Sequence, residues 1–338
     1  MPTNFTVALD GTPLMGPVGG IHRFTEQLIL ALRNEFPGDN YIPVSDQFAP
    51  TPKGLEKRWW LYGLNKALKR TGAQVFHGTD FAVPYLSRVP SVMTVHDLSP
   101  WNEPSPTSAR VRSRAGKLIS WKIPSFLHTP SEAVRREVIE TFKWPEDRIV
   151  AIPLAAAEMF TPDPRETVDP YFLYLGTHEP RKNLEVLVQA MAILDAQGIR
   201  IPLLMAGQSR PGYRLDLHPN IERLGPQSEA ELPRLYRNAT AVLYPSNYEG
   251  FGLPILEAMQ SGAPVIASDI PVHREVGGDA ALYASPKDPA AWASLMQSLI
   301  GGDPQRSAAS IARASQYSWQ KTARAFRDLY ARCLQANR

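Results

Sequence analysis

Two glutamates stand eight positions apart across a glycine-bearing turn, at Glu249 and Glu257. Pro254 suits the first position of a helix, so we expect a helix to begin there, with Glu257 in its first turn and Glu249 on the loop before it. The unpaired amides at such a helix start attract an anion, and the helix dipole adds to the attraction. These amides belong to Phe251, Gly252 and Leu253. The spacing predicts a phosphate site flanked by two carboxylates that bind sugar hydroxyls.

A second candidate site is the adjacent pair Arg181 and Lys182. The pair follows a predicted strand, Phe172–Leu175, after a short turn that begins at Gly176. Open α/β sheets bind ligands at the carboxyl ends of their strands, so we expect both cations to lie at a ligand site. Two cations there would stabilise the negative charge of a diphosphate leaving group. The alternative is a solvated surface pair.

The first predicted strand runs into a glycine-bearing loop that contains Gly16, Gly19 and Gly20. Gly19 and Gly20 would allow the backbone to approach a phosphate or sugar closely, next to the start of a helix. A dinucleotide fingerprint requires glycines at G-x-G-x-x-G spacing, which this loop lacks, so nicotinamide binding is disfavoured. The alternative is a flexible loop whose glycines only make turns.

Length and composition predict a protein with two domains. The chain has 338 residues, more than a single hydrophobic core usually serves. One cysteine, Cys333, excludes an internal disulfide framework, and a net charge of +3 is too small for a typical nucleic-acid binder. We expect neither a signal peptide nor a membrane-spanning helix, because no apolar segment is long enough. These features favour a cytoplasmic protein.

Short apolar runs alternate with helical patterns, which is typical of parallel α/β sheets. We predict an α/β protein with two doubly wound, Rossmann-like domains at 1–163 and 164–317, joined near Thr161–Arg165, and a last helix at 318–338 that packs back on the first domain. The strands predicted in the first domain are Phe5–Leu9, Gln74–His77, Ser91–His96, Phe126–His128 and Ile149–Ile152. Those of the second are Phe172–Leu175, Pro202–Ala206, Ile221–Leu224, Ala241–Tyr244, Pro264–Ala267 and Ala281–Tyr283.

The segment around the two glutamates resembles the signature of the retaining glycosyltransferases of family GT4, which have the GT-B fold. The matching residues are Pro245-Ser246, Tyr248–Gly252, Pro254 and Glu257–Met259. The Arg181-Lys182 pair, the Gly19-Gly20-Ile21 loop and the pair His96-Asp97 resemble GT4 sites in the same order. Many relatives carry an arginine directly after the glycine of the donor loop, where this chain has Thr177, so the chain resembles the subgroup in which the arginine sits beside the lysine.

The resemblance implies two Rossmann-like domains that face each other across a cleft, the first for the acceptor and the second for the donor. It implies transfer of a hexosyl group from a nucleoside diphosphate sugar, with retention at the anomeric carbon. GDP-mannose is the leading donor, in surface polysaccharide or glycolipid assembly. We expect no metal ion and no cofactor, since no Asp-x-Asp occurs in the chain.

Each matching residue receives a role from the resemblance. Arg181, Lys182 and the amides near Gly252 would stabilise the leaving diphosphate. Glu249 would hold hydroxyls of the transferred sugar, and Glu257 those of the ribose. His96 would contact the donor sugar or orient the acceptor, and Gly19 and Gly20 would lie against the donor phosphates. We further expect Gly225, with its neighbours Leu224 and Pro226, to form part of the nucleotide pocket.

Other functions remain open from the sequence. A glycoside hydrolase would use the two glutamates as acid and base, but it would have no diphosphate for the cations to neutralise. A GT-B epimerase or hydrolase of a nucleotide sugar would turn over the donor without an acceptor. A non-catalytic nucleotide-sugar binding protein would bind without turnover.

Two basic segments with aromatic residues, Lys53–Arg70 and Arg110–Lys122, dominate the charge of the first domain. Between Lys53 and Lys122 twelve lysines and arginines oppose four acidic residues. Basic residues beside tryptophan and tyrosine suit a helix that lies on an anionic membrane surface. The alternative is a pair of surface helices whose aromatic rings face the core. The segments also fit a lipid-linked acceptor, while a small-molecule acceptor stays open.

Overall fold

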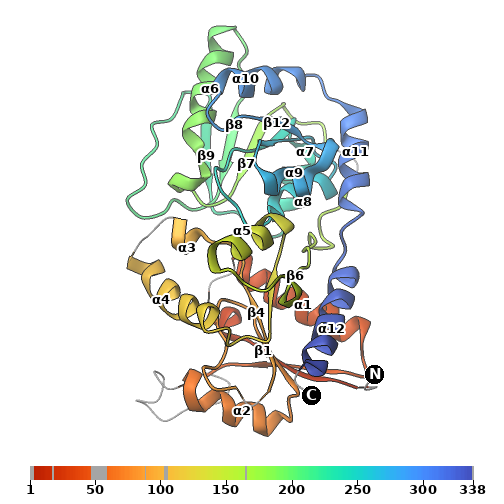
Figure 1. The fold of residues 1–338 in the computed structure, drawn as a ribbon. Coiled ribbons are helices and arrows are strands. Elements are labelled where there is room, and N and C mark those ends of the chain that lie inside the picture. Colours follow the sequence, from red (N-terminus) through yellow and green to blue (C-terminus); the bar gives the residue numbers. More distant parts are fainter. Residues whose placement is uncertain are drawn as a thin grey trace. The chain divides into compact units, whose positions relative to one another are not determined.

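The structure is a computed structural model, and it describes residues 4–16, 19–46, 59–87, 89–102, 106–163 and 166–336. The chain forms two compact units, Met1–Leu154 with Ser318–Arg338, and Ala155–Tyr317 (Figure 1). The division falls ahead of the predicted boundary at 163–164, and the last two residues of the predicted linker lie outside the described residues.

The first unit contains a parallel sheet whose described strands follow the order β2-β1-β3-β4-β5-β6. These strands are β1 (Thr6–Asp10), β2 (Asn40–Val44), β3 (Val75–Gly78), β4 (Ser91–Thr94), β5 (Phe126–Thr129) and β6 (Ile149–Ala151). Strand β2 is absent from the sequence-based prediction. It contains Pro43, which lowers the strand signal, and it lies at the edge of the sheet, where proline is tolerated.

Helices connect the strands of the first unit. They are η1 (Thr12–Met15), α1 (Gly20–Glu35), the π-helical turn η3 (Trp59–Gly63), α2 (Leu64–Thr71), α3 (Ser99–Asn102), α4 (Pro106–Ser120), α5 (Glu132–Phe142), η4 (Glu146–Arg148) and α12 (Trp319–Gln335). Helix α5 is capped by Ser131, whose hydroxyl oxygen accepts a hydrogen bond from the Val134 amide at 3.2 Å. The short helix α3 was not predicted.

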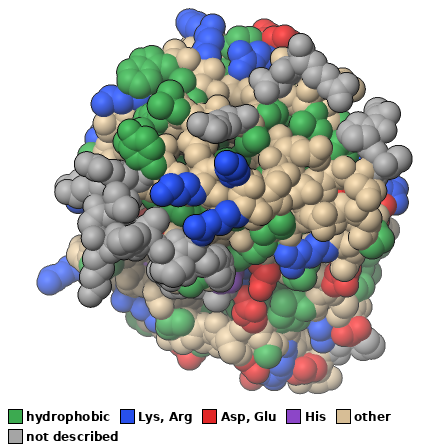
Figure 2. Space-filling view, turned by 90° about the horizontal axis from the view of Figure 1, so that it is seen from below, with side chains coloured by type: hydrophobic (Ala, Val, Ile, Leu, Met, Phe, Trp, Pro, Cys, Tyr) green, Lys and Arg blue, Asp and Glu red, His purple; other side chains and the backbone are tan. Residues whose placement is uncertain are grey.

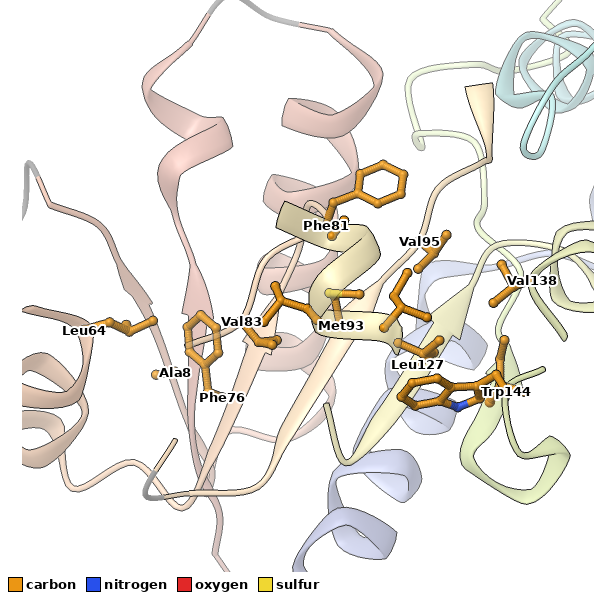
Figure 3. Packing of buried hydrophobic residues seen from close by; sticks show 14 of the residues in the cluster. Ala8, Leu64, Phe76, Phe81, Val83, Met93, Val95, Leu127, Val138 and Trp144 are labelled. Carbon is orange, nitrogen blue, oxygen red and sulfur yellow. The ribbon is translucent and has the colours of Figure 1, made fainter. Parts of the chain in front are cut away.

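The core of the first unit lies between the sheet and its helices. Strands β3, β4 and β5 are buried along their whole length, which explains their short, continuous apolar runs. Figure 3 shows side chains of this core, among them Phe76, Met93, Leu127 and Trp144. All four are at most 2% exposed.

The last helix, α12, completes the first unit and packs against α1. Its cap is Ser318, whose hydroxyl oxygen accepts from the Lys321 amide at 3.2 Å. Among the side chains of α12 that bind the rest of the unit, Thr322 donates to the Pro153 carbonyl at 2.8 Å, and Arg327 pairs with the buried Asp39 at 2.7 Å.

A chain of buried hydrogen bonds links α12 to three neighbouring strands. Tyr330 OH lies 2.8 Å from His77 Nδ1, and His77 Nε2 lies 2.8 Å from Thr94 Oγ1. Thr94 Oγ1 also lies 3.0 Å from His128 Nδ1, and His128 Nε2 lies 3.0 Å from the Ile152 carbonyl oxygen. Burial lowers the pKa of both imidazoles, so both rings are neutral at neutral pH. A carbonyl only accepts, so the single proton of His128 lies on Nε2, and every donor in the chain points from Tyr330 toward Ile152.

The second unit contains another parallel sheet, with its described strands in the order β12-β11-β10-β7-β8-β9. Its strands are β7 (Phe172–Leu175), β8 (Leu203–Ala206), β9 (Ile221–Gly225), β10 (Ala241–Tyr244), β11 (Val265–Ser268) and β12 (Leu282–Ala284). Its helices are η5 (Pro180–Lys182), α6 (Leu184–Ala196), α7 (Leu232–Asn238), α8 (Leu253–Gln260), α9 (Pro271–Gly277), η6 (Gly278–Ala280), α10 (Pro289–Ser298) and α11 (Pro304–Ala314). Two parallel α/β sheets confirm the predicted fold class, although α9 was missed.

Candidate active site

The second sheet reverses its strand order between β7 and β10. The chain runs from β7 outward to β8 and β9, and then returns to β10 on the other side of β7. The carboxyl ends of two adjacent parallel strands that diverge in this way leave a crevice, which is where such sheets bind ligands. Residues that follow β7 and β10 are therefore expected to share one site.

The cation pair and the first glutamate meet at this switch point. Arg181 and Lys182 lie on η5 after β7, and Glu249 lies on the loop after β10. Arg181 pairs with Glu249 at 2.9 Å, and Lys182 Nζ donates to the other carboxylate oxygen. The Arg181 carbonyl also accepts from the Asn247 amide at 2.9 Å, which fixes η5 against the second loop. The structure thus brings these three predicted site residues together.

Glu249 is ionised in this cluster. Burial by itself would raise the pKa of Glu249, which is 9% exposed, but Lys182 and Arg181 beside it hold the pKa well below its ordinary value. A carboxylate has about four lone-pair positions, so two ion pairs leave it able to accept hydrogen bonds from hydroxyls as well. The cluster combines a fixed positive charge with a hydroxyl acceptor.

Two residues of this site were missed in the sequence. Tyr244 ends β10, and its hydroxyl accepts from Lys182 at 3.2 Å while the ammonium lies 5.2 Å from its ring centre. Glu179 precedes η5 and pairs with Arg181 Nε at 2.9 Å. Their positions in the sequence could have indicated both as site residues, because each stands at or just beyond the carboxyl end of a predicted strand.

His273 on the unpredicted helix α9 lies behind the cluster and is fully buried. Its ring centre is 5.2 Å from that of Tyr244, and its Nδ1 binds the Ser268 carbonyl at 3.0 Å. Burial lowers the pKa of His273 to about 4, so the ring is neutral at neutral pH.

The second glutamate corrects the sequence-based expectation. Helix α8 begins at Leu253, one residue earlier than predicted, which places Glu257 beyond the first turn of the helix. Glu257 is 4% exposed, and its Oε2 accepts from the Tyr236 hydroxyl of α7 at 2.9 Å. The predicted placement of Glu257 in the first turn is therefore wrong, and the helix dipole does not stabilise its carboxylate, because that effect is confined to the first turn.

The turn into α8 has the backbone geometry that glycine permits. Gly252 precedes Leu253, the first helical residue, and has φ +103° and ψ +46°. Other residues rarely adopt this region, so the glycine allows the sharp entry into the helix. Phe251 is 5% exposed and its ring lies against Tyr317, which holds the loop from the other side.

Glycines also line the carboxyl edge of the sheet beyond β7. The Gly207 amide, after β8, donates to the Gly225 carbonyl at the end of β9 at 2.9 Å. A Cβ on Gly207 would lie 2.0 Å from the carbonyl oxygen of Gly176, so the loops after β7 and β8 are in direct backbone contact. Gly225 has φ +70° and thus ends the strand in a turn on this same edge.

The remaining predicted residues belong to the first unit. Gly19 is the cap of α1 and Gly20 its first residue, and a side chain on Gly20 would meet no atom within 4 Å. His96 follows β4 by two residues, since the strand ends at Thr94 rather than at His96 as predicted. Its Nε2 lies 2.7 Å from the Thr79 carbonyl oxygen and therefore carries the proton.

Within the described residues, no group of three or more histidine, cysteine, aspartate or glutamate side chains is placed to hold a metal ion.

The chain is similar to known glycosyltransferases. The family model described as "Glycosyl transferases group 1" matches residues 157–316, and that of "Glycosyltransferase Family 4" matches residues 18–156. An O-antigen chain mannosyltransferase B from Escherichia coli is 38% identical over 75% of this chain and 73% of its own length. An O-antigen chain mannosyltransferase from Salmonella typhimurium is 28% identical over 71% of this chain and 70% of its own length.

Solved structures agree on the fold. A sucrose-phosphate synthase from Thermosynechococcus elongatus superimposes with a TM-score of 0.74 at 21% identity, over 98% of this chain and 100% of that chain. The two family models account for consecutive parts of the sequence, and the Escherichia coli relative exceeds 30% identity over most of its length. The chain therefore belongs to the group 1 glycosyltransferases of family GT4, enzymes of the GT-B fold.

Proposed function

We propose that the protein transfers a mannosyl group from GDP-mannose to a hydroxyl of a growing O-antigen type polysaccharide, with retention at the anomeric carbon. The observation that carries the proposal is the Arg181–Lys182–Glu249 cluster at the switch point of the second sheet. The mannosyl donor and the O-antigen acceptor are inferred from the Escherichia coli and Salmonella relatives, whose names state those functions.

Each residue acts on the donor in this proposal. Arg181 and Lys182 stabilise the diphosphate as the glycosidic bond breaks, and the amide of Gly252 adds to this effect. Glu249 holds hydroxyls of the transferred sugar while it keeps both cations in place. The leaving phosphate accepts the proton of the attacking hydroxyl, so no cofactor or separate base is required.

The nucleotide itself is bound along the same edge of the sheet. We propose that Glu257 binds the ribose hydroxyls and that the turn at Gly225 contacts the base. In the first unit, Gly19 and Gly20 approach the donor phosphates, and His96 orients the acceptor through its Nδ1, since its Nε2 is bound to Thr79.

A thermal-shift panel of GDP, UDP, ADP and dTDP tests the donor site. We expect GDP at 100 times its Kd to stabilise the protein by about 2.7 kcal/mol. Glu257→Gln keeps an acceptor for Tyr236 but loses the charge that binds the ribose, so GDP affinity should fall about tenfold, which is about 1.4 kcal/mol.

Glu185→Gln is the matched control, because Glu185 also accepts from a tyrosine hydroxyl, that of Tyr213 at 3.0 Å. Stabilisation by UDP rather than GDP would reject the mannosyl donor. No response to any nucleotide would favour a glycoside hydrolase. Turnover of GDP-mannose without an acceptor would favour an epimerase or hydrolase, and binding without turnover a non-catalytic protein.

We also propose that the first unit contacts an anionic membrane surface. No helix in the described part of the chain is long and apolar enough to cross a bilayer. Three large apolar side chains are exposed near the basic helices α2 and α4: Tyr62 at 61%, Leu86 at 69% and Trp121 at 63%. Trp59 is buried instead, so the aromatic residues of the first basic segment divide between core and surface. Residues Lys53–Arg58 of that segment lie outside the described residues.

Basic side chains surround these apolar ones. A hollow of about 790 Å³ beside α2 is lined by Tyr62, Lys66, Lys69 and Leu86. A neighbouring hollow beside α4 is lined by Arg110, Lys117 and Tyr85, the residue before Leu86. Figure 2 views the molecule from below, the side on which α2 lies in Figure 1, and shows hydrophobic side chains beside lysines and arginines. Each such cation contributes about 1 kcal/mol to the free energy of binding to an anionic membrane surface.

Co-sedimentation with phosphatidylglycerol vesicles tests this contact. We expect binding that weakens with salt and falls at least tenfold in Tyr62→Ser/Trp121→Ser, because the rings enter the headgroup layer. Ile300→Ser removes an exposed apolar residue of the second unit and should leave binding unchanged. Equal binding by the double variant and the wild type would contradict the proposal.

A further inference from the structure

The first unit has a topological switch point of its own. From β1 the chain goes to β2 on one side and returns to β3 on the other side of β1. Strand β1 ends at Asp10, and Asp80 lies two residues beyond the end of β3. The Thr79 hydroxyl donates to the Asp10 carbonyl at 2.8 Å and so joins the two strand ends. Open α/β sheets bind ligands in the crevice at a switch point, so we expect a ligand site here as well.

A cavity of about 210 Å³ occurs at these strand ends. Its polar lining includes Asp10, Asp46, Asp80 and Arg114, and its apolar wall includes Trp59 and Trp60. Pockets for drug-sized ligands usually begin at about 300 Å³, so this cavity suits a single sugar ring rather than a longer ligand. Arg114 lies 4.9 Å from the ring centre of Trp60, which fixes the guanidinium against the apolar wall.

Asp10 is built for a ligand that donates hydrogen bonds. The residue is 3% exposed, and the amide and hydroxyl of Thr12 both donate to its Oδ1, at 3.0 and 2.6 Å. Within the described residues, no donor binds its other carboxylate oxygen, although the side chain lines the cavity. Burial raises the pKa of Asp10 to about 6, against the hydrogen bonds from Thr12. This oxygen can therefore accept a hydrogen bond from a hydroxyl of a ligand in the cavity.

The turn that carries Asp80 is held under strain. Phe81 has φ +49°, a conformation that is unfavourable for a bulky residue. Its amide donates to the Thr94 carbonyl at 3.1 Å, and a Cβ on Gly78 would lie only 1.6 Å from the Ala82 carbonyl oxygen. Such backbone strain is concentrated at ligand sites, where it fixes side chains in place.

The charged side chains that line the cavity indicate which class of ligand it binds. Three carboxylates against one guanidinium disfavour a phosphate and favour a neutral polyol whose hydroxyls donate. The indole wall provides an apolar surface for the C–H face of a sugar ring. We infer that this cavity binds the terminal sugar residue of the acceptor glycan, with Asp10 and Asp80 accepting hydrogen bonds from its hydroxyls. The inference rests on the proposed function, which requires a glycan acceptor.

Saturation-transfer NMR with methyl α-D-mannopyranoside tests the cavity directly, without a donor. We expect a signal with the wild-type protein and at least a tenfold weaker affinity in Asp10→Asn and in Asp80→Asn. Two variants are used because Asp10 also binds Thr12, and one of the two proteins is expected to keep its fold. Asp147→Asn is the matched control, since Asp147 is an exposed carboxylate of the same unit on η4.

GDP binding in the same samples separates this inference from the proposed function. Loss of mannoside binding in folded variants that still bind GDP would support the cavity. Mannoside binding that is equal in all variants, or absent from a wild-type protein that binds GDP, would overturn the inference about the cavity and leave the proposed function standing. A wild-type protein that binds the mannoside through Asp10 but no nucleotide would support the cavity and overturn the proposed function.

Discussion

Replacing Lys182 by methionine is expected to lower kcat/KM by about 10²- to 10³-fold, which is the usual loss when one preorganised donor to a developing negative charge is removed. Lys182 is 7% exposed and bound by Glu249 and the Tyr244 hydroxyl, so its ammonium is held in place before the substrate arrives. Water cannot replace it, because methionine fills a similar volume. The measurement is steady-state transfer from GDP-mannose.

The same substitution also weakens the fold, so a second variant is needed to separate the two effects. Lys182→Met leaves a buried carboxylate with one partner fewer, which costs about 3 kcal/mol. Lys182→Met/Glu249→Gln removes the buried carboxylate charge that has lost one of its two cations, and should restore most of the stability in urea unfolding but none of the activity. Recovery of activity in this double variant would show that Lys182 acts only on the structure.

Arg200→Met is the matched control for the loss of a cation. Arg200 precedes β8 at the amino edge of the sheet, its side chain is 79% exposed, and its contact with Asp195 is a surface pair. Surface ion pairs contribute between 0 and about 1 kcal/mol to the free energy of unfolding, so neither stability nor activity should change appreciably.

Acidification from pH 7 to pH 5 is expected to cost the wild-type protein about 2 kcal/mol of unfolding free energy through His128 alone. Burial lowers the pKa of His128 in the folded protein to about 3, against 6.5 in an exposed histidine. Above pH 6.5 both states hold a neutral ring. Between pH 6.5 and 3 only the unfolded chain takes up the proton, so stability falls as the pH falls through this window.

Urea unfolding at pH 5, 6 and 7 measures this effect. His128→Gln keeps a donor for the Ile152 carbonyl but cannot titrate, so its stability should depend less on pH than that of the wild type. Some dependence remains, because burial also lowers the pKa of His77, which the variant retains. Asp10 acts in the opposite sense, since its pKa is raised, but it is common to both proteins and cancels in the comparison.

His218→Gln serves as the control, because His218 lies beside Asp195 in the second unit and outside this hydrogen-bond chain. Its pH dependence should match that of the wild type. Identical curves for wild type and His128→Gln would mean that the buried imidazole is not the group that titrates on unfolding.

Much of the fold could be predicted because the local signals agree with the tertiary structure. Strands β7 and β10 have the bounds that the sequence predicted. In each of them an apolar pattern ends at turn or capping residues, and the element is buried as the pattern requires. Local signals failed where they were weak, as at β2, which contains a proline, and at the short helix α9.

The sequence by itself determined which residues stand at the ends of strands, and hence the candidates for binding and catalysis. It placed Arg181 and Lys182 after one strand and Glu249 after another, because apolar runs and turn residues are local properties of the chain. Only the tertiary structure decided that these strands are neighbours, since the order β10-β7 depends on long-range packing. The same holds for the cavity between Asp10 and Asp80 and for the chain from Tyr330 to Ile152, whose members are brought together by the sheet and by α12. The sequence does not indicate which distant side chains will pair. Their contacts form only when packing of the core brings the side chains together.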